Sequence, residues 1–153
     1  MKIWVDADAC PGPVRDIILR AGQRVKVHSV FVANHALSLP RLAYVSSVQV
    51  GAGLDVADQH IAQQAQPGDL AITQDIPLAA LLVPKGVVVL DPRGEVFTEE
   101  NVAERLSVRN FMQELRESGV TTGGPNGYSA QDRQQFAGAL DRELTRLVKA
   151  EPK

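Results

Sequence analysis

The sequence predicts an α/β domain of three layers, with a mostly parallel central sheet of about five strands and additional C-terminal helices. Two observations support this. Short apolar runs alternate with segments whose apolar residues recur at helical spacing. The runs are also continuous rather than alternating, as in strands covered on both faces. The 153 residues are expected to form a single domain, 1–153, with a helical extension over about 98–150.

The first part of the chain predicts a strand followed by a helix. Residues 2–5 form a short apolar run that ends at Asp6. Pro11 and Pro13 suit the first turn of a helix, because the N–H that proline lacks has no partner there. Apolar residues then recur at helical spacing, and Gly22 is expected to end this helix.

The middle of the chain continues the alternation of strands and helices. Strands are predicted at 25–33, 45–50, 70–73 and 87–90. One helix is expected to begin at Asp55 and to close at Pro67, and another to begin near Pro77 and to end at Gly86. Strands separated by helices favour a parallel sheet.

The last third of the chain is predicted to be helical around one loop. Residues 98–117 have helical spacing with acidic residues in the first turn, and 119–127 are rich in glycine. Ser129 to Asp132 resembles a capping signal before a final helix that runs through Lys149.

The composition is typical of an ordinary globular protein, with 44% apolar and 22% charged residues. The sequence contains no apolar run long enough for a membrane helix and no signal peptide, so no membrane partner is expected. The single cysteine, Cys10, cannot form an internal disulfide, which favours the cytoplasm. A net charge of −2 counts mildly against tight binding to duplex nucleic acid.

Aspartates gather where the predicted strands end. Asp6 and Asp8 follow the first strand, Asp55 and Asp58 follow the third, and Asp75 follows the fourth. The carboxyl ends of parallel strands share one edge of the sheet, so these carboxylates are expected to lie close together. Clustered carboxylates repel each other unless a proton, a basic group or a cation intervenes. Oxygen ligands favour Mg²⁺ or Mn²⁺, which could serve the cleavage of a phosphodiester bond.

Each aspartate also has a simpler interpretation. Asp6 could cap a helix as readily as bind a metal, and capping is the favoured role for Asp55. Asp58 lies one turn further on and could be part of a solvated helix face. Asp75 precedes a proline-started helix, where capping and metal binding are compatible. The metal hypothesis therefore depends on the convergence of the aspartates.

Two basic residues could contact a phosphate near this edge. Arg15 lies one helical turn beyond Pro11, although it could equally pair with Asp16. His35 follows the second strand, where a surface-loop role is the simpler interpretation.

Three segments resemble the YaiI/YqxD family of bacterial proteins, and the resemblance extends over nearly the whole chain. They are Asp6-Ala-Asp-Ala-Cys-Pro11, Gly51-Ala-Gly-Leu-Asp-Val-Ala-Asp58 and Gly68-Asp-Leu-Ala-Ile-Thr-Gln-Asp-Ile-Pro-Leu-Ala-Ala80. More distantly, the chain is similar to PIN-like nucleases, including the NYN branch. In those, an acid ends the first strand, others lie on a central helix, and Thr-x-Asp ends the fourth strand.

The PIN-like resemblance implies a fold and a chemistry. Asp6, Asp58 and Asp75 would hold the metal with help from Asp8 and possible help from Asp55, and Thr73 would orient a ligand or water. The implied activity is metal-dependent cleavage of RNA, by analogy from fold and site.

Two alternatives remain open. Asp6-Ala-Asp8 also resembles the start of haloacid-dehalogenase-like phosphatases, with Asp6 as the nucleophile. Those enzymes need a lysine ahead of their last acidic pair, and none lies between Lys26 and Lys85. The other alternative is a non-catalytic module that binds RNA or protein.

Overall fold

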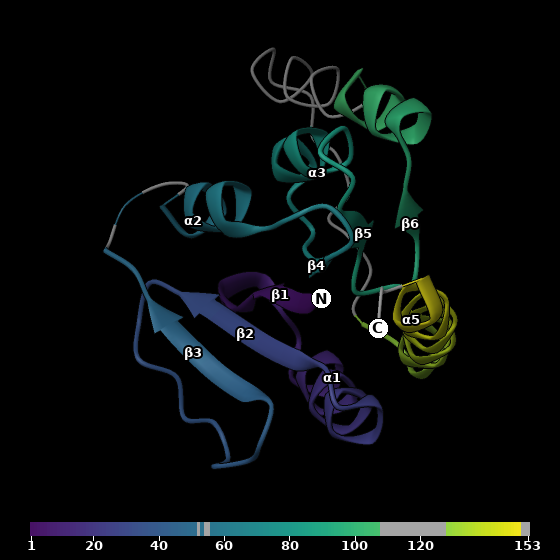
Figure 1. Ribbon diagram of the computed structural model, residues 1–153. Helices are drawn as coiled ribbons and strands as arrows, with labels where there is room; N and C mark the ends of the chain where they lie inside the picture. The colour runs from purple at the N-terminus through teal and green to yellow at the C-terminus, as the bar shows by residue number, and fades with distance from the viewer. Residues whose placement is uncertain (52, 54–55, 108–127, 151–153) are drawn as a thin grey trace.

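A six-stranded sheet runs through the part of the chain that the computed structural model describes, which is residues 1–51, 53, 56–107 and 128–150 (Figure 1). The strands are β1 (Lys2–Asp6), β2 (His28–Ala33), β3 (Val45–Gln49), β4 (Leu70–Ile72), β5 (Val88–Leu90) and β6 (Val96–Phe97). The helices are α1 (Gly12–Val25), α2 (Val56–Gln64), α3 (Ile76–Leu82) and α5 (Ala130–Ala150), with a short 3₁₀ helix, η1 (Ala7–Ala9), and a helical segment at 99–107.

The strand order is β3-β2-β1-β4-β5-β6, with the first strand of the chain near the centre. β1 to β5 are parallel, and only β6 pairs antiparallel to its neighbour. The chain builds the sheet outward from β1 to β3 and then crosses back to place β4 on the other side of β1. The order therefore reverses between β1 and β4, the position at which open α/β sheets bind their ligands.

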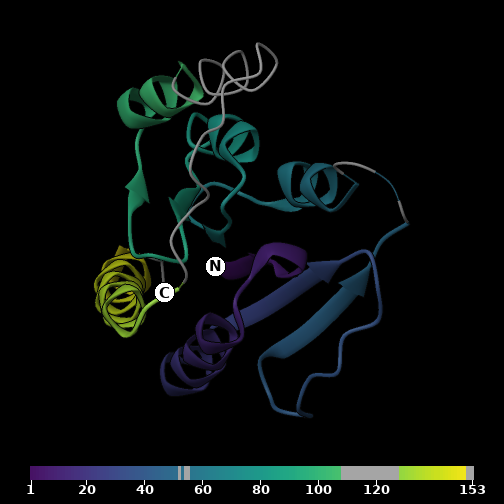
Figure 2. The same cartoon turned by 180° about the vertical axis from the view of Figure 1, so that it is seen from behind.

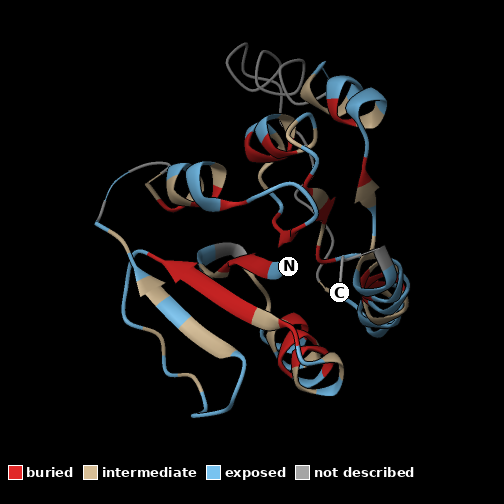
Figure 3. Ribbon diagram, in the orientation of Figure 1, coloured by how far each residue is buried: buried red, intermediate tan, exposed pale blue. Residues whose placement is uncertain are grey.

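Helices cover both faces of the sheet, as Figures 1 and 2 show from opposite sides. Ile3 and Val5 of β1 join the core under α1 and α5, whereas Trp4 between them joins the core under α2 and α3. This alternation is the period of a strand buried on both sides. Figure 3 shows β1 and β2 buried along most of their length, while β3 at the edge is more exposed. The predicted three-layer arrangement with a mostly parallel sheet is confirmed.

The prediction that Gly22 ends the first helix was wrong. The helix α1 continues to Val25, and Lys26 ends it in the left-handed conformation at φ 58°. β2 consequently begins at His28, three residues later than predicted. A Cβ at Gly22 would lie 3.0 Å from both Ser29 Oγ and Val27 O, so this glycine permits close packing of the helix against the strand.

The second half of the chain contains one strand that was not predicted. β6 has only two residues, Val96 and Phe97, too few for a recognisable alternation. The predicted capping signal is confirmed, because Asp132 N donates to Ser129 Oγ and Ser129 N donates to Asp132 Oδ2. The predicted helix over 98–117 is present at 99–107, and its remainder and the 119–127 loop lie outside the described residues.

The connection from β2 to β3 contains no helix, although the two strands are parallel. Residues 34–44 form it as turns and irregular backbone, and Tyr44 at its end has a φ of 62°. No helix in the described residues has the length and apolar character needed to cross a lipid bilayer.

Candidate functional site

The predicted convergence of aspartates is found at the carboxyl ends of the two central strands. Asp6 ends β1, and Thr73 and Asp75 directly follow β4, the strand paired with β1. The Thr73 hydroxyl donates to Asp6 Oδ2 at 3.0 Å, which ties the ends of the two strands together. The same hydroxyl accepts the Asp75 backbone N–H at 3.0 Å. Thr73 thus orients Asp6 directly and Asp75 through the backbone.

Asp6 is the most buried of these carboxylates, with only 7% of the residue exposed. It is the residue before η1, but its side chain makes no capping hydrogen bond, so the capping interpretation of Asp6 was wrong. Asp58, in the first turn of α2, lies within hydrogen-bonding reach of Asp6. Two carboxyl groups from different elements, β1 and α2, are therefore neighbours at this edge of the sheet.

The pKa of Asp6 is raised above its ordinary value. Burial is the largest cause, and the negative charges of Asp75 and Asp8 raise it further. The hydrogen bonds with Thr73 and Asp58 act in the opposite direction. The carboxyl group at the centre of the cluster is therefore costly to ionise in the isolated protein, and a cation would lower that cost.

Asp75 fills the first of the two roles that its position predicted, helix capping, and its metal-binding role stays a prediction. Its Oδ1 accepts the Leu78 N–H at 2.8 Å, which caps α3. That bond leaves Oδ2 available to a ligand. The negative charge of Asp75 also acts on Asp6, so the side chain that caps α3 belongs to the same group of carboxylates.

Asp8 is held at the rim of the cluster by the segment that follows β2. Its Oδ2 accepts the Asn34 backbone N–H at 3.0 Å, and its Oδ1 lies 3.0 Å from His35 Nδ1. The structure thus brings His35 to the site, with 60% of its side chain exposed. The Asn34 amide was not foreseen, because a backbone donor leaves no signal in residue type.

Cys10, which ends η1, has Asp6 and Arg15 of α1 as charged neighbours. Both Arg15 and Asp6 act electrostatically on Cys10, which places them around the same thiol. Burial raises the pKa of Cys10 to about 12, and Asp6 adds to this while Arg15 opposes it. The thiol is therefore protonated at neutral pH, as expected of a packing residue. Asp55, the remaining predicted ligand, lies outside the described residues.

The donor set at this edge consists of carboxylate oxygens, which suit a hard divalent cation. Within the described ranges, no three His, Cys, Asp or Glu side chains are grouped closely enough to hold an ion by themselves. Magnesium is commonly held by one or two carboxylates together with waters and substrate phosphate. The adjacent Asp6 and Asp58 fit that mode, with Asp75 and Asp8 close enough to add negative charge.

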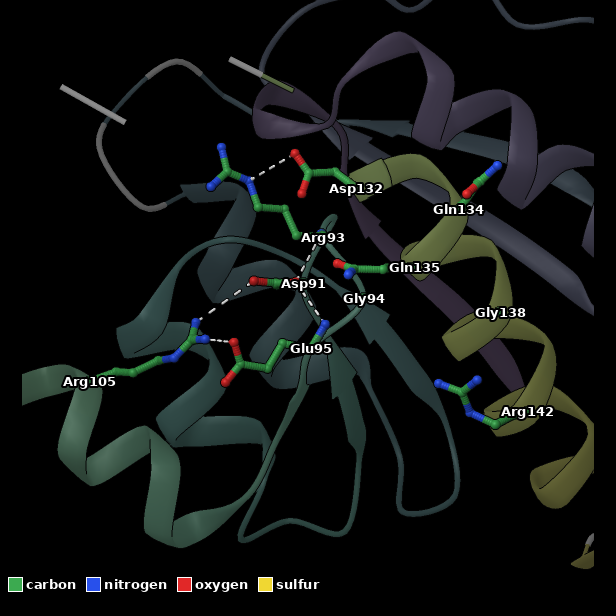
Figure 4. A pocket seen from close by; sticks show the side chains of 10 residues that line it. All are labelled: Asp91, Arg93, Gly94, Glu95, Arg105, Asp132, Gln134, Gln135, Gly138 and Arg142. Atoms are coloured by element: carbon green, nitrogen blue, oxygen red, sulfur yellow. Dashed lines mark hydrogen bonds and ion pairs between the residues drawn. The ribbon is translucent and has the colours of Figure 1, made fainter. Parts of the chain in front are cut away.

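A second group of charged residues surrounds a pocket of about 590 Å³ between the β5–β6 turn and α5 (Figure 4). Here arginines and carboxylates pair within the protein. Arg105 contacts both Asp91 and Glu95, and Arg93 lies 3.8 Å from Asp132. The turn itself is held by Asp91 Oδ1, which accepts the N–H groups of Arg93 and Glu95. These pairs join the β5–β6 turn to α5 and to the helix at 99–107.

Comparison with known proteins identifies close relatives in several bacteria. A UPF0178 protein of Myxococcus xanthus is 97% identical over 153 residues, which is all of both chains. UPF0178 proteins of Citrifermentans bemidjiense and Syntrophobacter fumaroxidans are 57% and 55% identical over 149 residues, 97% of each chain. No solved structure matches the chain, so the PIN-like resemblance stays a prediction.

The family model described as "Uncharacterized BCR, YaiI/YqxD family" matches residues 4–146, which include Asp6 and all the other candidate ligands. With this match and relatives more than half identical along almost their whole length, the chain belongs to the YaiI/YqxD family.

Proposed function

We propose that this protein is a PIN-like, divalent-metal-dependent nuclease that cleaves RNA, with its metal at the Asp6–Asp58 pair. The main support is the state of Asp6. This carboxyl is buried at the carboxyl end of a central strand, next to a second carboxyl, and its pKa is raised. Among the described residues, no lysine or arginine forms an ion pair with Asp6. Such a site gains stability when a cation binds.

The residues divide into those that hold the ion and those that place the substrate. Asp6 and Asp58 hold Mg²⁺ or Mn²⁺, and Asp75 and Asp8 complete the negative field around it. When bound, the ion supplies charge neutralisation and activates a water for attack on phosphorus. Thr73 keeps Asp6 oriented through its 3.0 Å hydrogen bond. His35, held by Asp8, and Arg15 contact the phosphates on either side of the scissile bond.

The test is cleavage of end-labelled single-stranded RNA in Mg²⁺, in Mn²⁺ and in EDTA. Wild type should cleave only with metal, and Asp6→Asn and Asp58→Asn should reduce the rate at least about a hundredfold, because outer-shell changes alone cost about 10–100-fold. Asp141→Asn is the matched control, since Asp141 is an exposed residue of α5 paired with Arg24. Equal rates in Asp6→Asn and Asp141→Asn would contradict the proposal.

The two alternatives give different results in the same assay. A phosphatase would release phosphate from a phosphomonoester and would leave RNA intact, with a phosphate trapped on Asp6. A non-catalytic module would bind RNA equally well in EDTA and in the Asp6→Asn variant.

A further inference from the structure

A pocket of about 390 Å³ lies between α2 and α3, and it begins at the aspartate cluster. Asp58 from α2 and Asp75 at the start of α3 both line it, so the pocket and the proposed metal site share two carboxylates. Its volume falls within the roughly 300–1,000 Å³ typical of small-molecule sites. A substrate phosphate placed at the cluster would have its neighbouring group within reach of this pocket.

The wall contributed by α3 is apolar. Leu81 is 64% exposed and Pro77 is also exposed, although both lie within two helical turns of Asp75. Leucine with so much exposed surface at the mouth of a pocket is suited to cover the face of a flat apolar group. Transfer of that surface out of water would favour binding.

The wall contributed by α2 carries two amides. Gln59 and Gln63 are four residues apart and therefore project from the same side of the helix into the pocket. Neither side-chain amide hydrogen-bonds to another described residue. Each amide offers two donors and an acceptor side by side. Such groups can recognise the edge of a planar heterocycle, as glutamine does with bases.

We infer that this pocket binds one unpaired nucleobase of the RNA, adjacent to the bond that is cleaved. The inference rests on the proposed function for the position of the phosphate. A nucleobase has two apolar faces and an edge of donors and acceptors, which match Leu81 and Pro77 on one side and Gln59 and Gln63 on the other. Proteins that read single-stranded RNA turn bases out of the stack in this way. Base-paired RNA cannot enter the pocket, so the substrate is single-stranded at the cleaved position.

The experiment uses a short fluorescent RNA and a series of copies, each with one abasic nucleotide at a different position. Affinity is measured by anisotropy in Ca²⁺, and cleavage is measured separately in Mg²⁺ or Mn²⁺. Wild type should lose at least about fivefold in affinity at one abasic position, next to the cleavage site. Leu81→Ala and Gln63→Ala should raise KM about five- to tenfold with little change in kcat. Both variants should also lose the discrimination against that abasic position.

Two matched controls separate the pocket from general surface effects. Gln64→Ala changes the neighbouring glutamine of α2, which does not line the pocket, and Leu42→Ala changes another exposed leucine, 44% exposed. Both should behave as wild type. Cleavage that is unaffected by Leu81→Ala and Gln63→Ala would overturn the inference while the nuclease proposal stands. Binding that depends on Leu81 and Gln63 without any cleavage would support the pocket and overturn the nuclease.

Discussion

Two regions of the molecule contain clustered carboxylates, and they differ in what neutralises them. Beside α5, arginines contact Asp91, Glu95 and Asp132 (Figure 4). At the carboxyl ends of β1 and β4, Asp6 and Asp75 have a hydroxyl and backbone amides as partners, and no arginine or lysine of the described ranges pairs with either.

The pKa values reflect this difference. Burial raises the pKa of both Asp91 and Asp6, but Arg105 and Arg93 oppose the rise at Asp91. At Asp6 the neighbouring charges, Asp75 and Asp8, are negative and add to the rise. The region beside α5 is compensated by arginines of the fold, whereas the strand-end cluster has only His35, beside Asp8, among the described basic residues, and Asp6 and Asp75 would be compensated by a proton or by an added cation. Under the proposed function, the first region stabilises the fold and the second binds the ion.

The sharpest test of this contrast compares Asp6→Asn with Asp91→Ala in the RNA cleavage assay. Asp6→Asn should reduce kcat at least about a hundredfold. Asp91→Ala should leave kcat within about twofold, because Asp91 belongs neither to the strand-end aspartate cluster nor to the pocket between α2 and α3. Comparable losses in both variants would show that the two regions do not divide function from structure.

A smaller loss of activity is expected when Thr73, which positions Asp6, is substituted. Thr73→Ala removes the hydroxyl between Asp6 Oδ2 and the Asp75 N–H and should lower kcat about 10–100-fold. It should also weaken Mn²⁺ binding measured by calorimetry. Thr73→Ser retains the hydroxyl and should recover most of both, which a merely steric role of Thr73 does not predict.

For stability, a substitution in the region beside α5 should be more harmful than one in the strand-end cluster. Asp91→Ala leaves the N–H groups of Arg93 and Glu95 without their acceptor and should lower the free energy of unfolding by about 1–3 kcal/mol. Asp6→Asn should instead raise it by about 0.5–2 kcal/mol in EDTA, since it removes a buried charge at a functional site. Urea denaturation at neutral pH measures both values.

The gain from Asp6→Asn should depend on pH. A carboxyl whose pKa is raised by folding stabilises the fold below its unfolded pKa of 3.8, and this contribution is lost as the pH rises through the folded pKa. The stability difference between Asp6→Asn and wild type should therefore grow with increasing pH and then level off. A difference that is constant from acid to neutral pH would contradict the raised pKa.

The smallest expected effects are differences in unfolding free energy between substitutions of two arginines beside the pocket at α5. Arg105 contacts two carboxylates and lies 5.0 Å over the Phe97 ring, so Arg105→Ala should cost about 1–2 kcal/mol of unfolding free energy. Arg142 is exposed and pairs with no carboxylate of the described residues, so Arg142→Ala should change it by less than about 0.5 kcal/mol. Thermal unfolding of the two variants provides the comparison.

Much of the fold could be predicted because strands buried on both faces leave a strong local signal. The apolar runs located β1 to β5, and the turn residues located most helix starts. The end of α1 was missed because Gly22 serves tertiary packing against Ser29, which spacing along the chain does not reveal. The strand order, and with it the reversal between β1 and β4, is likewise a property of the assembled sheet.

The residues that gather at the candidate site could be predicted from the sequence, but only some of the contacts between them could. The rule that ligands gather at strand ends predicted that Asp6, Asp8 and Asp75 lie together at one edge of the sheet, which is where the structure has them, and their role as ligands stays a prediction. The contact between Asp6 and Asp58 depends on how α2 packs on the sheet, and the Asn34 amide depends on the path of a loop. Gln59 and Gln63 gave no signal, since glutamines on a helix are usually solvated.

The hydrogen bond between Thr73 and Asp6 also has a consequence during protein synthesis. It links two residues separated by 67 positions, and β1 pairs with β4 over the same span. A nascent chain that has not yet released β4 from the ribosome has β1 exposed along one edge, with Asp6 unsupported. Closing so long a loop is slow compared with local helix formation. The chain should therefore assemble its aspartate cluster only when the centre of the sheet closes, so that an incomplete chain does not yet hold these carboxylates together.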